Sequence, residues 1–312
     1  MPKFLWKVSN LSVALRLKHL HYGLDTPKEF LLYCLDWLSA KLGCNNPRLY
    51  YKARVKRLAK TCREGSMYRI RDVKLPVLSD ADEKLLFSSI FWDTFTSYVL
   101  FNDDYSEKTF DLCDEMLPEG LYGLVSDKVN VTVEPGDIVI DAGSWVGDFA
   151  AYASVKGAQV YAFEPTDTTF DLLKRTVELN GNITPIKQGL SDQKTSMTLF
   201  VNEDGNSGGN ALRDKITVRM IPSSTVQTTT LDDFVREHNL PRVDFIKADI
   251  EGFERHMLAG AQETLARFAP KLALCTYHLK DDPQVMAELI LKANPKYNIV
   301  QKRMKLFASV PE

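Results

Sequence analysis

Acidic side chains and a histidine stand at the ends of two predicted strands in the second half of the chain. Asp249 and Glu251 follow the buried run VDFIKA, and His278 ends the run KLALCTYH. Adjacent strand tips in one sheet can face a common crevice, so these groups can act on one bound molecule. Histidine titrates near pH 6.5, closer to neutral than a free carboxylate at about 4. We therefore favour His278 as a general base, with Asp249 orienting it or the substrate.

Glu251 is the third candidate for this chemistry and ranks after the other two. An alternative is that Asp249, Glu251 and His278 bind Mg²⁺ or a similar ion, which would polarise a diol in place of a base. Their spacing alone does not show such a site, so we predict no metal.

The stretch VIDAGSWVGDFA, residues 139–150, predicts where a ligand binds. A buried strand ends near Asp141, and a helix is expected to start at about Val146, so the turn between them lies at the carboxyl end of a strand, where open α/β sheets bind ligands. Gly143 and Gly147 let a ligand approach the backbone, and the helix start offers free N–H groups.

Ser144 and Trp145 lie in the same turn and are further candidate contacts. Trp145 either packs over the ligand or fills the interface between helix and sheet, and the sequence leaves both readings open.

The next predicted strand, YAFEP, ends in Glu164, which lies 23 residues after Asp141. An acid about 20 residues beyond the glycine turn is placed to bind the hydroxyls of a ribose. Asp141 would repel a pyrophosphate but suits a ligand with a cationic group, which favours S-adenosylmethionine over NAD. Asp192, after the third strand, either accepts a hydrogen bond from the adenine amino group or is a turn residue.

These motifs together resemble the FkbM-type family of S-adenosylmethionine-dependent methyltransferases. The resemblance covers roughly residues 120–310 and rests on VEPGDIVIDAGSWVGDFAAYA, VYAFEPTDTTFDLLKRTVELN, LSDQ, TTLDDF, VDFIKADIEGFERHMLAGAQETL and PKLALCTYH. It implies O-methylation of a hydroxyl on a carbohydrate or natural product. The first 105 residues lie outside the shared pattern.

Strands and helices alternate from about residue 120, which indicates a doubly wound, mostly parallel sheet. With the resemblance, we predict an α/β, Rossmann-like fold with a seven-stranded methyltransferase sheet and a terminal antiparallel strand. Residues 1–105 are predicted as a mainly helical domain that shapes the acceptor site or an oligomer interface, with helices in 26–43, in 46–65 and from Ser79. Residues 106–135 are predicted as a connecting segment with a strand pair, and residues 136–312 as the donor-binding domain. The segment 195–214 is predicted as a strand and a glycine-rich loop, a candidate flap.

Composition and charge set the broad class. The chain has 312 residues with five cysteines and no CxxC pair, which argues for reduced thiols and against a disulfide framework. Neither a signal peptide nor a membrane span is expected, so we predict a cytoplasmic protein.

The charge is distributed unevenly. Residues 1–76 carry 16 Lys and Arg against 5 Asp and Glu, or +11, whereas the whole chain has a net charge of −2. This front segment is either a solvated surface or a face for an anionic partner, such as a phosphate-bearing substrate, membrane headgroups or nucleic acid.

Two alternatives to a carbohydrate O-methyltransferase remain. The first is an RNA ribose methyltransferase; the N/D-P-P-Y/F string used for base amino groups is absent, and the basic residues lack the interleaved aromatics of an RNA module, so nucleic acid is not the expected partner. The second is a non-catalytic protein that binds S-adenosylmethionine. The sequence leaves the acceptor, the methylated position and the oligomeric state open.

Overall fold

The computed structural model describes residues 56, 59–70, 72–95, 122–202, 207, 210–212, 220–302 and 304–311. The chain divides into two compact units, one of residues 1–71 and 79–121 and the other of residues 72–78 and 122–312. These boundaries differ from the predicted ones at residues 105 and 135. The reason is that β3 (Val73–Pro76) packs on the helices of the second unit, where the Lys74 N–H donates to the Asn180 side chain over 3.1 Å.

The first unit contains β1 (Arg63–Glu64), β2 (Met67–Ile70) and α5 (Asp80–Phe95), with β1 and β2 paired antiparallel. The helix predicted from Ser79 is confirmed, and the Ser79 hydroxyl caps it by accepting the Asp82 N–H over 3.2 Å. The strands β1 to β3 fall in the segment 1–105 that we predicted as mainly helical. The helix predicted in 26–43, and most of the one in 46–65, lie outside the described residues.

A seven-stranded sheet forms the centre of the second unit, in the order β14-β15-β13-β12-β6-β7-β8. Strands β6, β7, β8, β12 and β13 pair in parallel, and β15 runs antiparallel to both β13 and β14, which confirms the predicted fold class and the terminal antiparallel strand. The strands are β6 (Ile138–Ala142), β7 (Gln159–Phe163), β8 (Ile183–Ile186), β12 (Phe245–Ala248), β13 (Lys271–Cys275), β14 (Asn298–Lys302) and β15 (Lys305–Ser309).

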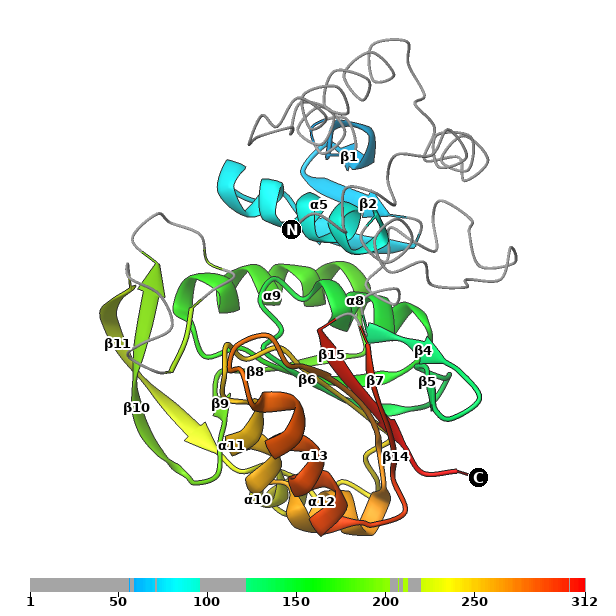
Figure 1. Cartoon of the computed structure of the whole chain (residues 1–312). Coiled ribbons are helices and arrows are strands. Elements are labelled where there is room, and N and C mark those ends of the chain that lie inside the picture. The colour runs from blue at the N-terminus through cyan, green and yellow to red at the C-terminus, as the bar shows by residue number, and fades with distance from the viewer. Residues whose placement is uncertain are drawn as a thin grey trace, which may run out of the picture. The chain divides into compact units, whose positions relative to one another are not determined.

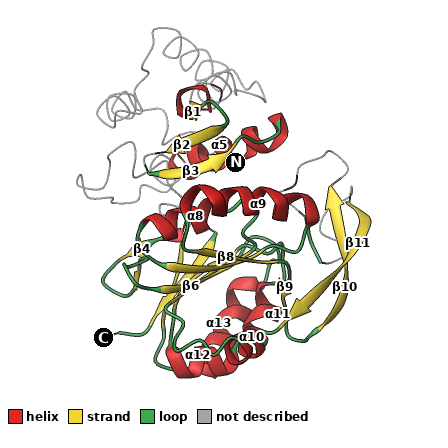
Figure 2. Ribbon diagram, turned by 180° about the vertical axis from the view of Figure 1, so that it is seen from behind, coloured by secondary structure: helices red, strands yellow, loops and turns green. Residues whose placement is uncertain are grey.

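Helices cover both faces of this sheet. Figures 1 and 2 show α8 and α9 on one face and α10 to α13 on the other. The helices are α8 (Asp148–Val155), α9 (Asp167–Asn180), α10 (Leu231–Glu237), α11 (Glu254–Ala259), α12 (Gln262–Phe268) and α13 (Asp282–Ala293). None of the helices in the described part of the chain is long and apolar enough to cross a membrane.

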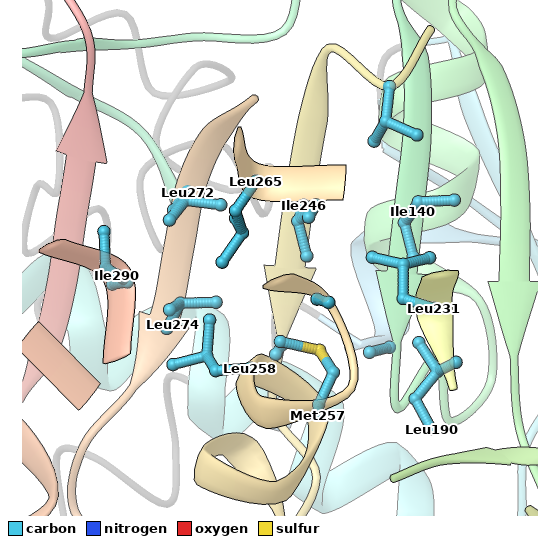
Figure 3. Packing of buried hydrophobic residues seen from close by; sticks show 14 of the residues in the cluster. Ile140, Leu190, Leu231, Ile246, Met257, Leu258, Leu265, Leu272, Leu274 and Ile290 are labelled. Atoms are coloured by element: carbon cyan, nitrogen blue, oxygen red, sulfur yellow. The ribbon is translucent and has the colours of Figure 1, made fainter. Parts of the chain in front are cut away.

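The core between the sheet and helices α10 to α13 is closely packed and aliphatic. Figure 3 shows Ile140, Ile246 and Leu272 on neighbouring strands, facing Met257 and Leu265 from the helices, and all five are buried. Because successive side chains of a strand point to opposite faces, the alternate residues of β6 and β12 point toward α8 and α9. This alternation decides where the polar residues of both strands lie.

A second, smaller sheet was not predicted as such. The run ITPIKQGLSD forms two strands, and only β8 belongs to the large sheet. The other strand, β9 (Gly189–Leu190), pairs with β11 (Met220–Thr229), which pairs in turn with β10 (Thr195–Asn202). Asp192 therefore does not follow the third strand of the large sheet. Most of the glycine-rich loop of the predicted flap, residues 203–206, 208–209 and 213–214, lies outside the described residues.

The predicted strand pair in 106–135 is present as β4 (Leu124–Val125) and β5 (Asn130–Val131), which are antiparallel. A turn at 126–129 closes the pair, and the Pro135–Gly136 turn that follows leads into β6.

Candidate active site

A cleft lies at the carboxyl ends of the parallel strands. It brings together five of the predicted site residues, Gly143, Trp145, Glu164, Asp249 and Glu251. Phe163, Pro165 and Leu190 give it an apolar wall, and Ser207 and Asn210 also line it. An apolar cleft with a few convergent polar groups at this edge is the usual form of a ligand site in an open α/β sheet.

The turn between β6 and α8 forms one wall of the cleft, and hydrogen bonds hold it on both sides. The N–H groups of Gly143 and Ser144 donate to the Phe163 carbonyl over 3.1 and 2.9 Å, which ties the turn to the end of β7. Trp145 is left-handed, with a φ of 49°, and its indole N–H donates to Ser207 over 2.8 Å. A non-glycine residue in this region marks a strained position, and such positions cluster at functional sites.

Glu164 lies at the tip of β7, as predicted, and its carboxylate is held rigidly. Oε2 accepts the Trp145 N–H over 3.0 Å and Oε1 accepts the Thr166 N–H over 2.9 Å. Burial raises the pKa of Glu164 above its ordinary value, against the effect of these hydrogen bonds. The Thr166 and Thr169 hydroxyls also hydrogen-bond to this carboxylate, so a ribose in the cleft would exchange its hydroxyls for theirs.

Three of the residues predicted to contact the ligand do not line the cleft. Asp141 has no exposed surface and pairs with Lys247, so its carboxylate is neutralised within the protein. The Ser144 hydroxyl donates to the Asp141 carbonyl over 2.8 Å and shapes the turn. Gly147 faces α9 at Leu173, and its φ of +83° is a backbone conformation that residues with a side chain rarely adopt.

Asp192 is also absent from the cleft wall. Its carboxylate lies 3.4 Å from Nδ1 of His256, on α11. The turn reading of Asp192 therefore fits this arrangement better than the adenine contact.

Gly143 is the residue of this turn at which a side chain is least tolerated. Its φ is +72°, and a Cβ would lie 2.0 Å from the Asp249 carbonyl oxygen. We predict that Gly143→Ala lowers the free energy of unfolding by about 2–4 kcal/mol, from strain and overpacking together.

Urea unfolding measures this, with Gly136→Ala as the matched control. Gly136 has a φ of +86° but nothing within 4 Å of its added Cβ, so only the strain of about 1–2 kcal/mol is expected. Equal losses in the two variants would show that the close approach at Asp249 is unimportant.

Asp249 follows β12, and two tyrosines that the sequence analysis did not single out hold its carboxylate. Tyr122 donates its hydroxyl to Oδ2 over 2.9 Å, and Tyr277 donates to Oδ1 over 2.8 Å. Burial by itself would raise the pKa of Asp249, but the nearby Lys247 and His278 cations outweigh it and lower this pKa. Asp249 is therefore an ionised, oriented carboxylate of low basicity. Only the position of Tyr277 next to His278 could have drawn attention to it.

Glu251 enters the cleft because the chain leaves the extended conformation after Ala248. Glu251 and Gly252 both have left-handed backbones, with φ of 54° and 91°. Burial raises the pKa of Glu251, and this effect outweighs the opposing contact with His278. Glu251 is thus a strained, partly buried carboxylate at the wall of the cleft, with more basic character than an ordinary glutamate.

His278 lies behind this wall, with a side chain only 3% exposed. Its Nε2 is 3.3 Å from Glu251 and its Nδ1 is 3.3 Å from Glu254. Burial by itself would lower the pKa of His278, but the two carboxylates outweigh it and raise the pKa to about 10. At neutral pH the side chain is an imidazolium, which has no lone pair to accept a proton. This geometry does not support the predicted role of His278 as the base.

The raised pKa of His278 predicts how stability changes with pH. The pKa is about 6.5 in the unfolded chain and about 10 in the folded one, so the folded state holds more protons between these values. The contribution to stability is complete below pH 6.5 and is lost as pH rises toward 10, with a slope of at most about 1.4 kcal/mol per pH unit. Urea unfolding from pH 6 to 10 measures it, and His278→Gln should flatten the profile. An equal slope in both proteins would contradict the imidazolium.

Three of the residues around His278 have ligand atoms close enough together to hold a metal ion, counting His278 itself. Ligand atoms of Asp249, Glu254 and His278 lie within 4.8 Å of one another, and Glu254 replaces Glu251 in the set that we considered from sequence. The imidazolium and Lys247 already balance part of the negative charge of this cluster.

Comparison with known proteins shows the family to which this chain belongs. The Methyltransferase FkbM domain matches residues 140–297, about half of the chain, and the chain belongs to this family. It is 27% identical over 161 residues to the hexuronic acid methyltransferase AglP of Haloferax volcanii, covering 51% of this chain and 64% of that protein. It is 30% identical over 169 residues to the methyltransferase sdnD of Sordaria araneosa, covering 44% and 64%. The chain thus spans just under two thirds of the length of both relatives.

A third relative is the 31-O-demethyl-FK506 methyltransferase FkbM of Streptomyces tacrolimicus, 23% identical over 208 residues and covering 57% of this chain and 79% of that protein. Among solved structures, the methyltransferase FkbM of Methylobacillus flagellatus is similar with a TM-score of 0.42 and 17% identity, covering 84% of this chain and 59% of that one.

Proposed function

We propose that this protein transfers a methyl group from S-adenosylmethionine to a hydroxyl of a carbohydrate or a related natural product. One observation carries the proposal: Glu164, suited to a ribose, and Glu251, suited to accept a proton, line the same cleft. A donor and an acceptor bound there would be held close together, which is the main requirement for a two-substrate transfer.

The residues present fit S-adenosylmethionine. The Glu164 carboxylate would accept the ribose hydroxyls in exchange for those of Thr166 and Thr169. Phe163, Pro165 and Leu190 offer apolar surface to the adenine. The closely packed Gly143 turn would border the amino acid part of the donor. When bound, S-adenosylmethionine supplies an electrophilic methyl group on a sulfonium. It carries no pyrophosphate, which agrees with a cleft whose polar walls are carboxylates.

Glu251 is the residue that we propose to remove the acceptor proton. A hydroxyl becomes a good nucleophile only as its proton leaves, and the best base has a pKa raised toward the working pH. Glu251 meets this condition, whereas the pKa of Asp249 is lowered and His278 is already protonated. The strained backbone of Glu251 keeps its side chain at the wall of the cleft.

Asp249 is then the residue that orients the acceptor. Tyr122 and Tyr277 each donate to one of its oxygens, so the carboxylate is fixed in place. Lone pairs remain to accept a hydrogen bond from a second acceptor hydroxyl. The His278 imidazolium lies 3.8 Å from Asp249 and 3.3 Å from Glu251, and it keeps the two carboxylates close in spite of their repulsion.

The names of the relatives support this class of acceptor. One relative is a hexuronic acid methyltransferase, and another is named for methylation of FK506 at a hydroxyl position. A hexuronic acid carries a carboxyl group as well as hydroxyl groups, so the experiment must distinguish a methyl ether from a methyl ester.

The experiment is methyl transfer from isotopically labelled S-adenosylmethionine to a panel of hexoses, hexuronic acids and their oligosaccharides. We expect label in a product that survives mild alkali, because a methyl ether is stable where a methyl ester of a uronic acid hydrolyses. Label lost in alkali would mean carboxyl methylation, which needs no base. Label only in added RNA would indicate ribose methylation, and binding of the donor without any transfer would favour a non-catalytic role.

Metal removal tests the alternative that Asp249, Glu254 and His278 bind a metal ion. We predict that turnover persists after exhaustive EDTA treatment, because Glu251 supplies the basic group and the cluster already holds an internal cation. The measurement is the initial rate before and after treatment, and again after Mg²⁺ is added back. A rate that falls with EDTA and recovers with Mg²⁺ would replace Glu251 with a bound ion.

A further inference from the structure

An oppositely charged pair lies in the interior of the large sheet. Asp141 on β6 and Lys247 on β12 are register partners in neighbouring parallel strands, so their side chains point to the same face. Lys247 Nζ lies 2.9 Å from Asp141 Oδ1, and the two side chains are 4% and 0% exposed. The same face of the two strands otherwise carries Val139 and Phe245, which are fully buried.

The ammonium group of Lys247 reaches beyond Asp141 to the cofactor turn. Nζ donates to the Gly143 carbonyl over 2.6 Å and lies 3.4 Å from the Ala142 carbonyl. The two carbonyls are its hydrogen-bond acceptors, and Asp141 supplies the counter-charge. Because the Lys247 side chain is buried, it is not available to a substrate.

Stability alone does not account for the Asp141–Lys247 ion pair. Removing two charges from water opposes their mutual attraction, and apolar side chains of similar volume often serve a core equally well. What an apolar residue cannot do is donate to the Gly143 carbonyl. That carbonyl belongs to a glycine with a φ of +72°, packed against the Asp249 backbone.

We propose that Lys247 is a positioning residue that fixes the cofactor turn through the Gly143 carbonyl, and that Asp141 acts on the donor only by holding Lys247. The proposal rests on the proposed function in taking S-adenosylmethionine as the ligand of this turn. Lys247 also lies 5.2 Å from the ring centre of Tyr122, which donates to Asp249, so the same ammonium borders the acceptor side of the cleft.

The decisive variant is the double substitution Asp141→Asn with Lys247→Met, alongside Lys247→Met alone. The double variant leaves no uncompensated buried charge, so it separates the lost charge pair from the lost hydrogen bond to Gly143. We expect it to regain most of the stability that Lys247→Met loses in urea unfolding. We also expect its affinity for S-adenosylmethionine to stay about tenfold to a hundredfold below that of the wild type, the usual effect of losing a hydrogen bond from a charged group.

Hydrogen exchange measures the turn without any donor present. In the double variant the amides of residues 143–147 should exchange at least about tenfold faster than in the wild type, because the donor that fixes the turn is gone. Lys271→Met is the matched control. Lys271 also pairs with a carboxylate and a carbonyl, those of Asp137 and Thr132. It lies at the amino end of β13, away from the carboxyl ends of the strands where the cleft lies. Lys271→Met should change neither the exchange of the turn amides nor the affinity for S-adenosylmethionine.

A double variant that binds S-adenosylmethionine as tightly as the wild type, with unchanged exchange in the turn, would overturn the proposal and reduce Lys247 to a counter-charge. Failure of the wild type to bind the donor would refute the proposed function instead, and the exchange result would still decide whether Lys247 fixes the turn.

Discussion

Replacing Glu251 with glutamine is expected to lower kcat by about 10²- to 10⁴-fold, the usual contribution of a general base. Glutamine keeps the size of the side chain but cannot take up the acceptor proton. Affinity for S-adenosylmethionine, measured by calorimetry, should change little, because the donor side of the cleft is formed by Glu164 and the Gly143 turn. The rate is measured by methyl transfer to the best acceptor of the saccharide panel.

The matched control for Glu251→Gln is Glu263→Gln on α12, which makes the same chemical change at a side chain that is 78% exposed. It should leave kcat unchanged. Asp249→Asn should raise KM for the acceptor more than Glu251→Gln does, because Asp249 orients and Glu251 removes the proton. Full turnover by Glu251→Gln would show that another group, or a bound ion, activates the acceptor.

Glu164→Ala is expected to weaken S-adenosylmethionine binding by about 10²-fold or more. The change removes the carboxylate that would accept the ribose hydroxyls. It also leaves the Trp145 and Thr166 N–H groups, which shape the turn, without their acceptor. Glu164→Gln keeps one acceptor oxygen and the volume, so a smaller loss of about tenfold is expected.

Calorimetric titration of both Glu164 variants measures this, with Glu178→Ala as the control. Glu178 lies on α9 and its side chain is exposed, so binding should be unaffected. Equal affinities of the wild type and Glu164→Ala would place the ribose elsewhere, and the interpretation of the cleft as a nucleoside site would fall.

The centre of the large sheet could be predicted from sequence because β6, β7, β12 and β13 are short, mostly buried runs bounded by turn signals. The small sheet could not. Its strand β9 is two residues long and follows β8 after only two residues, so periodicity cannot separate the two strands. The helix α8 begins at Asp148, two residues after the predicted start, because Gly147 is left-handed and caps it.

At the candidate site, the sequence predicts which residues lie close together but not what each of them does. Residue types placed Asp249, Glu251 and His278 together correctly, and they do lie within a few ångströms of one another. Their roles depended on features that a sequence does not display. The left-handed backbone of Glu251 brings it to the cleft, and a second carboxylate, Glu254, favours the protonated form of His278 from the other side.

The role of Asp141 could not be predicted from the sequence either. Its type and position suggested a direct contact with a cationic ligand, but its register partner across the sheet is Lys247, and the two charges meet inside the protein. Pairing between strands distant in sequence cannot be derived from either strand alone, because register depends on the whole sheet.

The most direct measurement of the proposed function is calorimetric titration of the wild-type protein with S-adenosylmethionine, with NAD titrated in parallel. We predict one site with affinity in the micromolar range for S-adenosylmethionine and no heat of binding for NAD, because Glu164 suits a ribose while the carboxylates around the cleft oppose a pyrophosphate. Binding of NAD in preference to S-adenosylmethionine, or of neither, would contradict the assignment of this cleft to a methyl donor.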